Sequence, residues 1–162
     1  MCSARANSVP ELIRQFPRPG ELVWIGLRPG RGQAMLSVAD VLADTAYGLD
    51  GDRYQGSNGK RQVSLMQWEH LAVISALTGK SVTPDLLRRN LIIKGINLLA
   101  LKDRRFRIGA AEFAATGLCH PCSRMEHLLG PGGYNAMRGH GGLTAQVIGS
   151  GIIRLGDQLI AE

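Results

Sequence analysis

The chain has 162 residues, of which 44% are hydrophobic and 20% are charged, and its formal net charge at pH 7 is +6. This length and this balance are typical of a single globular domain that buries a core. Aromatic residues make up only 5%, which argues against a surface that stacks nucleic-acid bases, and no run approaches the roughly 18 apolar residues that a membrane helix needs.

The first 19 residues are polar and contain three of the prolines, and they are expected to form an N-terminal extension. Ser8 followed by Glu11 predicts a capped short helix over residues 11–15, which Pro17 and Pro19 end. The segment lacks the apolar region of a secretory signal, so a cytoplasmic protein is expected.

Residues 20–162 show short apolar or alternating runs separated by glycine-rich turns, a pattern typical of strands. The predicted strands cover residues 20–27, 35–43, 62–66, 90–93, 104–108, 111–115, 143–148, 152–154 and 157–160, of which 143–148 and 152–154 are expected to form a hairpin. Residues 47–61 are predicted as a loop, and 98–101 begin an apolar element. Together these runs predict a mostly β fold, a closed or partly open barrel, with short inserted helices.

Three inserted helices are predicted. One begins at residues 67–70, carries Leu71, Ile74 and Leu77 at helical spacing, and stops at Gly79. A second starts at Thr83, with proline in its first turn. A third covers residues 122–129.

Residues 116–142 concentrate reactive groups, since they hold two of the three cysteines, at CxxC spacing, and three of the four histidines. Three cysteines do not make a disulfide framework, so Cys119 and Cys122 are expected to be reduced. A helix start at Cys122 favours its thiolate form. Two alternatives remain open: a buried, inert cysteine, and a CxxC redox pair or zinc site completed by His127 or His140.

The positive charge is typical either of a solvated basic surface or of a protein that binds a small anion. Arginines predominate over lysines, and Arg28, Arg31, Arg53 and Arg138 each lie within two residues of a glycine. Because arginine recognises phosphate in a planar, bidentate manner, a small anionic ligand is expected, and nucleic acid is not.

The segments GLDGDRY, RQVSLMQ, LRRNLII, CHPCSRM, GHGGLTAQV and RLGDQL follow one another in this order along the chain. This set resembles the MOSC domain, which is named after the C-terminal part of molybdenum-cofactor sulfurase. The resemblance covers residues 20–162 and implies one mostly β barrel domain. It also implies the molybdenum cofactor (molybdopterin) as ligand and a cysteine that serves molybdenum or sulfur chemistry.

Cys122 matches the Pro-Cys element of single-domain members, so the resemblance implies that it is the catalytic and metal-ligating residue. Cys119 is the second candidate. In some relatives the metal-bound cysteine stands three residues further on, at the position of Met125 here. The resemblance and the local sequence together predict these cofactor-binding residues: Asp52, Arg53, Arg61, Arg88, Asn90, Arg124, Arg138 and His140. For the loop and Arg-Asn segments, an Asp-Gly turn and a solvated face are the alternatives.

The expected function is therefore molybdenum-cofactor binding, or sulfur carriage for that cofactor, or a small molybdoenzyme that reduces N-hydroxylated compounds. The chain has no room for the pyridoxal-phosphate domain of the larger sulfurases, so a sulfur-donor or reductase protein is the expected partner. A non-catalytic module for an anionic cofactor and a small CxxC protein are the alternatives. No Ser-His-Asp or HExxH pattern points to a hydrolase.

Overall fold

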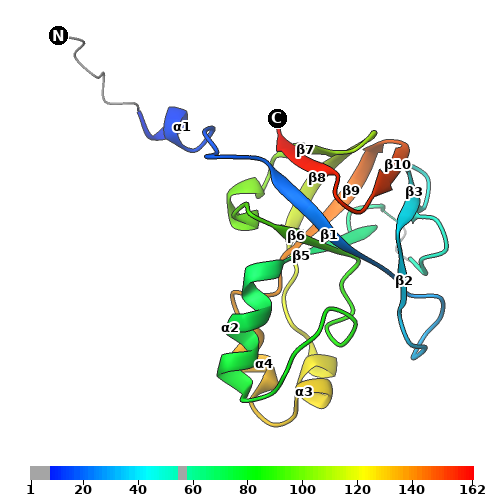
Figure 1. Cartoon of the computed structure of the whole chain (residues 1–162), viewed down its shortest axis with the longest axis vertical. Helices are drawn as coiled ribbons and strands as arrows, with labels where there is room; N and C mark the ends of the chain where they lie inside the picture. Colours follow the sequence, from blue (N-terminus) through cyan, green and yellow to red (C-terminus); the bar gives the residue numbers. More distant parts are fainter. Residues whose placement is uncertain (1–7, 55–57) are drawn as a thin grey trace.

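The computed structural model describes residues 8–54 and 58–162, and it is built around a closed barrel (Figure 1). In this described part, the ring order is β11-β7-β8-β9-β5-β6-β1, and pairing of β11 with β1 closes it. The strands of the ring are β1 (Gly20–Leu27), β5 (Val63–Gln67), β6 (Leu91–Lys94), β7 (Arg105–Ile108), β8 (Ala111–Leu118), β9 (Leu143–Gly149) and β11 (Gln158–Ala161). Strand β2 (Leu36–Val38) adds to β1 outside the ring. The predicted mostly β barrel is confirmed.

One pair of neighbouring barrel strands, β5 and β6, is parallel. Parallel strands need a crossover connection, and here it contains helix α2 (Trp68–Thr78). Gly79 ends the helix in the left-handed conformation, at φ 69°, as predicted. A smaller sheet has the order β10 (Gly151–Arg154), β3 (Asp40–Asp44), β4 (Gly48–Leu49).

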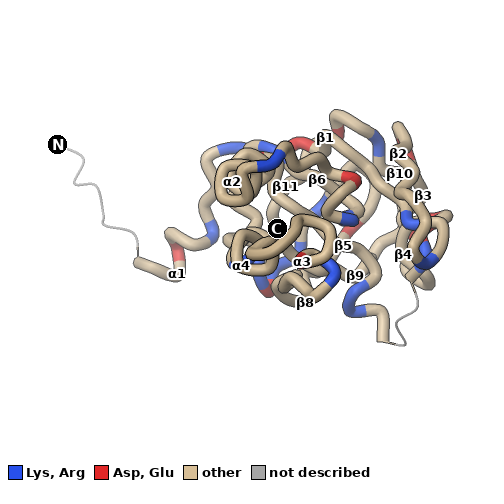
Figure 2. The backbone as a smooth tube through the Cα atoms, turned by 90° about the horizontal axis from the view of Figure 1, so that it is seen from below, with Lys and Arg blue, Asp and Glu red and all other residues tan. Residues whose placement is uncertain are grey.

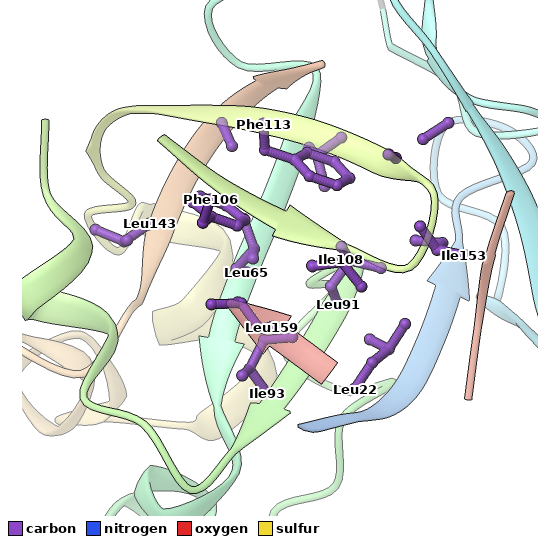
Figure 3. Packing of buried hydrophobic residues seen from close by; sticks show 14 of the residues in the cluster. Leu22, Leu65, Leu91, Ile93, Phe106, Ile108, Phe113, Leu143, Ile153 and Leu159 are labelled. Atoms are coloured by element: carbon purple, nitrogen blue, oxygen red, sulfur yellow. The ribbon is translucent and has the colours of Figure 1, made fainter. Parts of the chain in front are cut away.

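Alternating side chains of the barrel strands fill its interior (Figure 3). Strand β7 shows the pattern clearly, because Phe106 and Ile108 are buried while Arg105 and Arg107 face solvent. Phe106 lies opposite Phe113 of β8, and their rings stack with centroids 5.4 Å apart. Full burial of such a side chain stabilises the fold by about 1.5–3 kcal/mol.

A second apolar cluster joins one end of the barrel to the helices. Helices α2, α3 (Ser123–Leu129) and α4 (Gly133–Met137) lie together at that end (Figure 1, bottom). Strand β5 is buried on both faces, so Leu65 belongs to the barrel core and Met66 to the helix cluster. Met125 and Leu129 pack α3 into the same cluster, which fixes the segment that follows Cys122. No helix of the described residues is both long and apolar enough to cross a bilayer.

Two predictions about the elements were wrong. Residues 143–148 and 152–154 do not form a hairpin: β9 pairs with β8 and β5, whereas β10 pairs with β3. The chain changes sheets at the Gly-Ser-Gly turn, where pairing partners far away in sequence decide the outcome. Thr83 starts only isolated turns, in which Leu87 N–H donates to the Pro84 carbonyl. No helix follows, because Arg88 adopts φ +56° and leaves the helical region.

The remaining differences are smaller. The predicted strand over residues 35–43 is two strands, β2 and β3, and β4 lies within the predicted loop. Helix α1 covers Val9–Leu12, earlier than predicted, and keeps the Ser8–Glu11 capping box. Residues 98–101 form a short 3₁₀ helix. Leu77 is 60% exposed although its spacing on α2 predicted burial.

Candidate functional site

Five arginines from separate parts of the sequence line one pocket of about 290 Å³. Figure 2 shows that basic residues occupy many separate segments, so it is the fold that brings these five together. Two come from the loop after β1, one follows β4, one precedes β6, and one lies in the first turn of α3. The lining residues are Arg28, Gly30, Arg31, Arg53, Arg88 and Arg124, none of them acidic.

A second pocket of about 400 Å³ adjoins the first, because Arg88 and Arg124 line both. Its other lining residues are Gly32, Ser123, His127 and Leu128. The two pockets, called the arginine pocket and the side pocket below, together form a continuous concave surface between the β1–β2 loop and α3.

Asp52 holds one of these arginines in place. Its carboxylate, fully buried, accepts from the Arg28 guanidinium through Nε at 3.1 Å and Nη2 at 2.9 Å. It also accepts from the Arg28 backbone N–H at 2.8 Å. Such a charge-assisted, bidentate arrangement restricts the side chain to one orientation. Arg53 N–H donates to the Arg28 carbonyl at 2.7 Å, which joins the two loops that carry the arginines.

Asn90 is fully buried and connects Asp52 to the barrel. Its Nδ2 donates to Asp52 Oδ1 at 3.1 Å and to the Gly26 carbonyl at 3.0 Å. Its Oδ1 accepts from the Ser64 backbone N–H at 3.0 Å and from the Ser64 hydroxyl at 3.1 Å. The predicted residues Asp52 and Asn90 therefore contact the arginine scaffold and do not line the pocket themselves.

Replacing Asn90 with alanine is expected to lower the free energy of unfolding by about 3 kcal/mol. The change leaves the Gly26 carbonyl, the Ser64 N–H and Asp52 without their shared partner, and each buried group left unsatisfied costs about 1–3 kcal/mol. Urea denaturation followed by tryptophan fluorescence measures this. The same substitution at exposed Asn135 of α4 is expected to change stability by at most about 0.5 kcal/mol. Equal effects at the two positions would contradict the proposed role of Asn90.

Arg88 is partly buried and lies close to other positive charges. Its Nη1 donates to the Gln33 carbonyl at 2.8 Å, and its buried Nε has no partner among the described residues. Burial lowers the pKa of Arg88, and the positive charges of Arg124 and Arg28 lower it further, against the opposing charge of Asp52. An anion bound between these guanidinium groups would relieve their mutual repulsion.

The two predicted thiols differ in exposure. Cys122 is exposed and occupies the N-cap of α3, whereas Cys119 is only 7% exposed. The Cys119 N–H donates to the Gly142 carbonyl at 2.8 Å, which anchors the start of the CxxC segment beside β9. Ser123 and Arg124, which line the side pocket, directly follow Cys122. The fold therefore places an exposed thiol next to the arginine-lined surface.

A zinc site at the CxxC segment finds no support. Both cysteines are free, and the described residues contain no group of three or more His, Cys, Asp or Glu side chains that could hold a metal ion. Zinc needs four ligands in a structural site and three in a catalytic one.

The other predicted residues lie elsewhere. Arg61 is exposed in the turn before β5, and Arg138 is exposed at the end of α4. The His140 ring meets the His70 ring edge to face, with centroids 4.9 Å apart, and its Nδ1 is buried without a partner among the described residues. His70 lines a different, small pocket of about 30 Å³.

Stability is expected to fall at acid pH through His70. Burial lowers the pKa of His70, and His140 lowers it further, while Glu69 raises it. The unfolded chain therefore binds this proton more tightly, so the stabilisation is complete above pH about 6.5 and is lost as the pH falls through the lower folded pKa. His70→Gln should flatten this part of the unfolding free-energy profile, whereas His120→Gln, at an exposed position, should leave it unchanged. Parallel profiles for wild type and His70→Gln would contradict this assignment.

Sequence reasoning did not select Arg28 and Arg31 as site residues. The signal for them was the sequence Arg-Pro-Gly-Arg-Gly, in which arginines alternate with turn residues. It also did not foresee that Arg89 would be buried. Arg89 donates from Nε to the Gly141 carbonyl at 2.9 Å and from Nη1 to the Leu87 carbonyl at 3.0 Å, so it fixes backbone behind the site.

The fold is similar to those of several solved structures. The YuaD protein from Bacillus subtilis superposes with a TM-score of 0.77 at 16% identity, covering 90% of this chain and 97% of that one. YiiM from Geobacillus stearothermophilus gives 0.71 at 19% identity, covering 89% and 75% of the two chains. YiiM from Escherichia coli gives 0.72 at 18% identity, covering 90% and 70%.

The structural similarities show the fold, whereas comparison of the sequence with family models shows the family. A search of curated proteins finds no match. The family model described as "MOSC domain" matches residues 42–160. This span contains both CxxC cysteines and three of the five arginines that line the arginine pocket, Arg53, Arg88 and Arg124. The chain belongs to the MOSC domain family.

Proposed function

We propose that this protein binds the molybdenum cofactor, with the cofactor's phosphate in the arginine pocket and Cys122 as a thiolate ligand of the metal. The observation that carries the proposal is the convergence of five arginines beside an exposed cysteine.

The residues present suit this group in charge, chemistry and size. A phosphate needs cationic donors and no competing carboxylate, and the arginine pocket has the first without the second. The buried Nε of Arg88 has no partner among the described residues, so an anion in this pocket could accept from it. Soft thiolates are suitable ligands for a metal such as molybdenum. The volumes of about 290 and 400 Å³ lie at the lower end of what small-molecule sites occupy, roughly 300–1,000 Å³.

The chain's own residues would bind and orient the ligand. Arg28, held by Asp52, would offer its remaining N–H donors in a preset direction. Arg88 and Arg124 line both pockets, so they would contact the ligand at the junction between its phosphate and its pterin. Bound molybdenum would supply two-electron redox chemistry or a site for sulfur. Either role requires a second protein, a reductase or a sulfur donor, and such a partner belongs to the proposal.

Metal and pterin analysis tests the proposal. Protein produced in a host that makes the molybdenum cofactor should contain close to one molybdenum and one pterin per chain, and protein from a cofactor-deficient host should contain neither. Absence of both from the competent host would overturn the proposal. If the loaded protein reduces N-hydroxylated compounds with an artificial electron donor, it is an enzyme, and without turnover it is a carrier.

A further inference from the structure

Helix α1 carries an apolar face that packs against nothing in its own chain. Val9, Leu12 and Ile13 follow the i, i+3, i+4 spacing that places side chains on one face. They are 69%, 52% and 59% exposed, and no residue of the helix is buried. The helix projects from the barrel (Figures 1 and 2). Because so short a helix is not stable in water by itself, we expect it to pack against an apolar surface.

An apolar pocket of about 370 Å³ lies at the base of this N-terminal arm, residues 8–19. Its barrel side consists of Ile96, which follows β6, and of Ile160 and Ala161 of β11. The rest of its lining comes from residues 14–19 of the arm. Ile160 is exposed, so this arm pocket offers apolar surface that the chain leaves uncovered.

The helix cannot turn back into the arm pocket of its own chain. Phe16 packs against the barrel core, and the Arg104 guanidinium lies 5.9 Å from the centre of its ring, so the arm is anchored there. The helix ends at Leu12, which leaves only residues 13–15 before that anchor. Pro17 and Pro19 restrict the backbone that follows it. The same pocket on a second copy has no such restriction.

Charge also favours a second copy as the occupant. Glu11 is the one charged residue of α1, and it is exposed. Arg14 and Arg18 line the arm pocket and form no salt bridge among residues 8–54 and 58–162. Seating α1 in the arm pocket of another copy would bring its carboxylate to these guanidinium groups. Since every copy has both the helix and the pocket, two copies can make the contact twice around a two-fold axis.

We infer that this protein forms a symmetric dimer by exchange of its N-terminal arms, with the apolar face of each α1 in the arm pocket of the other copy. The arm lies beside the C-terminus, at the opposite end of the barrel from α2, α3 and α4 (Figure 1). The arginine pocket adjoins α3, so the dimer forms with or without a ligand there.

Sedimentation velocity of the full chain at rising concentration tests the dimer. The wild type should reach about twice the 17.5 kDa of one chain. Leu12→Asp puts a charge on the apolar face of α1 and should leave single chains with an unchanged unfolding midpoint, since Leu12 is exposed. Ile160→Asp should remove the same contact from the pocket side. Leu77→Asp, at an equally exposed leucine of α2, should keep the dimer.

A mixture of the Leu12→Asp and Ile160→Asp chains distinguishes arm exchange from any other dimer. The first chain keeps an intact arm pocket and the second an intact α1, so a mixed pair retains one of the two contacts. Fluorescently labelled chains of the two kinds should therefore associate more tightly with each other than with themselves. A single-chain mass for the wild type at every concentration, a dimer that survives Leu12→Asp, or a mixture that associates no better than its components would overturn the inference.

Discussion

Replacing Cys122 with serine should remove nearly all molybdenum from protein made in a cofactor-competent host, while the fold stays intact. The side chain is exposed, so no core packing is lost. Cys122 is the N-cap of α3, and serine is among the preferred N-cap residues, so the helix should be at least as stable as before. A hydroxyl is a much poorer ligand than a thiolate for a soft metal site. Metal content per chain, measured beside the unfolding midpoint, gives the result.

Cys119→Ser is the matched control, because it makes the same chemical change three residues earlier. Cys119 is 7% exposed and lies beside Gly142, so its variant should keep the metal. In wild type, an alkylating reagent should modify Cys122 well before Cys119, as site-resolved mass spectrometry can show, since thiol reactivity requires access. Metal loss from Cys119→Ser alone, or earlier labelling of Cys119, would exclude Cys122 as the ligand.

Gly142→Ala should be the most destabilising single substitution near the site, by more than about 4 kcal/mol. Gly142 has φ +89°, which side chains rarely tolerate, and an added Cβ would overlap the backbone carbonyl oxygen of Leu65. That carbonyl belongs to β5, in the barrel wall, and cannot rotate away as a side chain would. Gly142 also accepts the Cys119 N–H, so its displacement would disturb the start of the CxxC segment. Chemical denaturation measures the loss, and failure to obtain folded protein would agree with it.

Gly79→Ala isolates the backbone part of this effect. Gly79 also has a positive φ, +69°, but an added Cβ there meets no atom within 4 Å. Its replacement should cost only the left-handed conformation, about 1–2 kcal/mol. If the two alanine variants lose similar stability, the overlap with Leu65 is relieved by small shifts and the close approach of β9 to β5 is not essential.

The sequence determined the fold class and the extent of several elements by itself. Residues 20–27 form β1 as predicted, because an apolar, β-branched run between turn residues is stable only as a strand in this setting. Gly79 ends α2 in the left-handed conformation, and a glycine directly after a helical apolar pattern predicts such an end from the sequence alone. The exposed Cys122 at the start of a helix was also predictable from Pro121 and the apolar spacing after it.

Only the tertiary structure decided which strands pair and which arginines meet. Strand β10 joins β3 and not its neighbour β9, because the register is set by partners more than a hundred residues away. Arg28 and Arg31 reach the pocket because Asp52 and Asn90 hold the loop after β1, whereas Arg138 lies at the end of α4. Charge and arginine content left a solvated basic surface and a small-anion site both open. Which arginines line one pocket could not be predicted, because they come from loops that contact one another only once the barrel has closed.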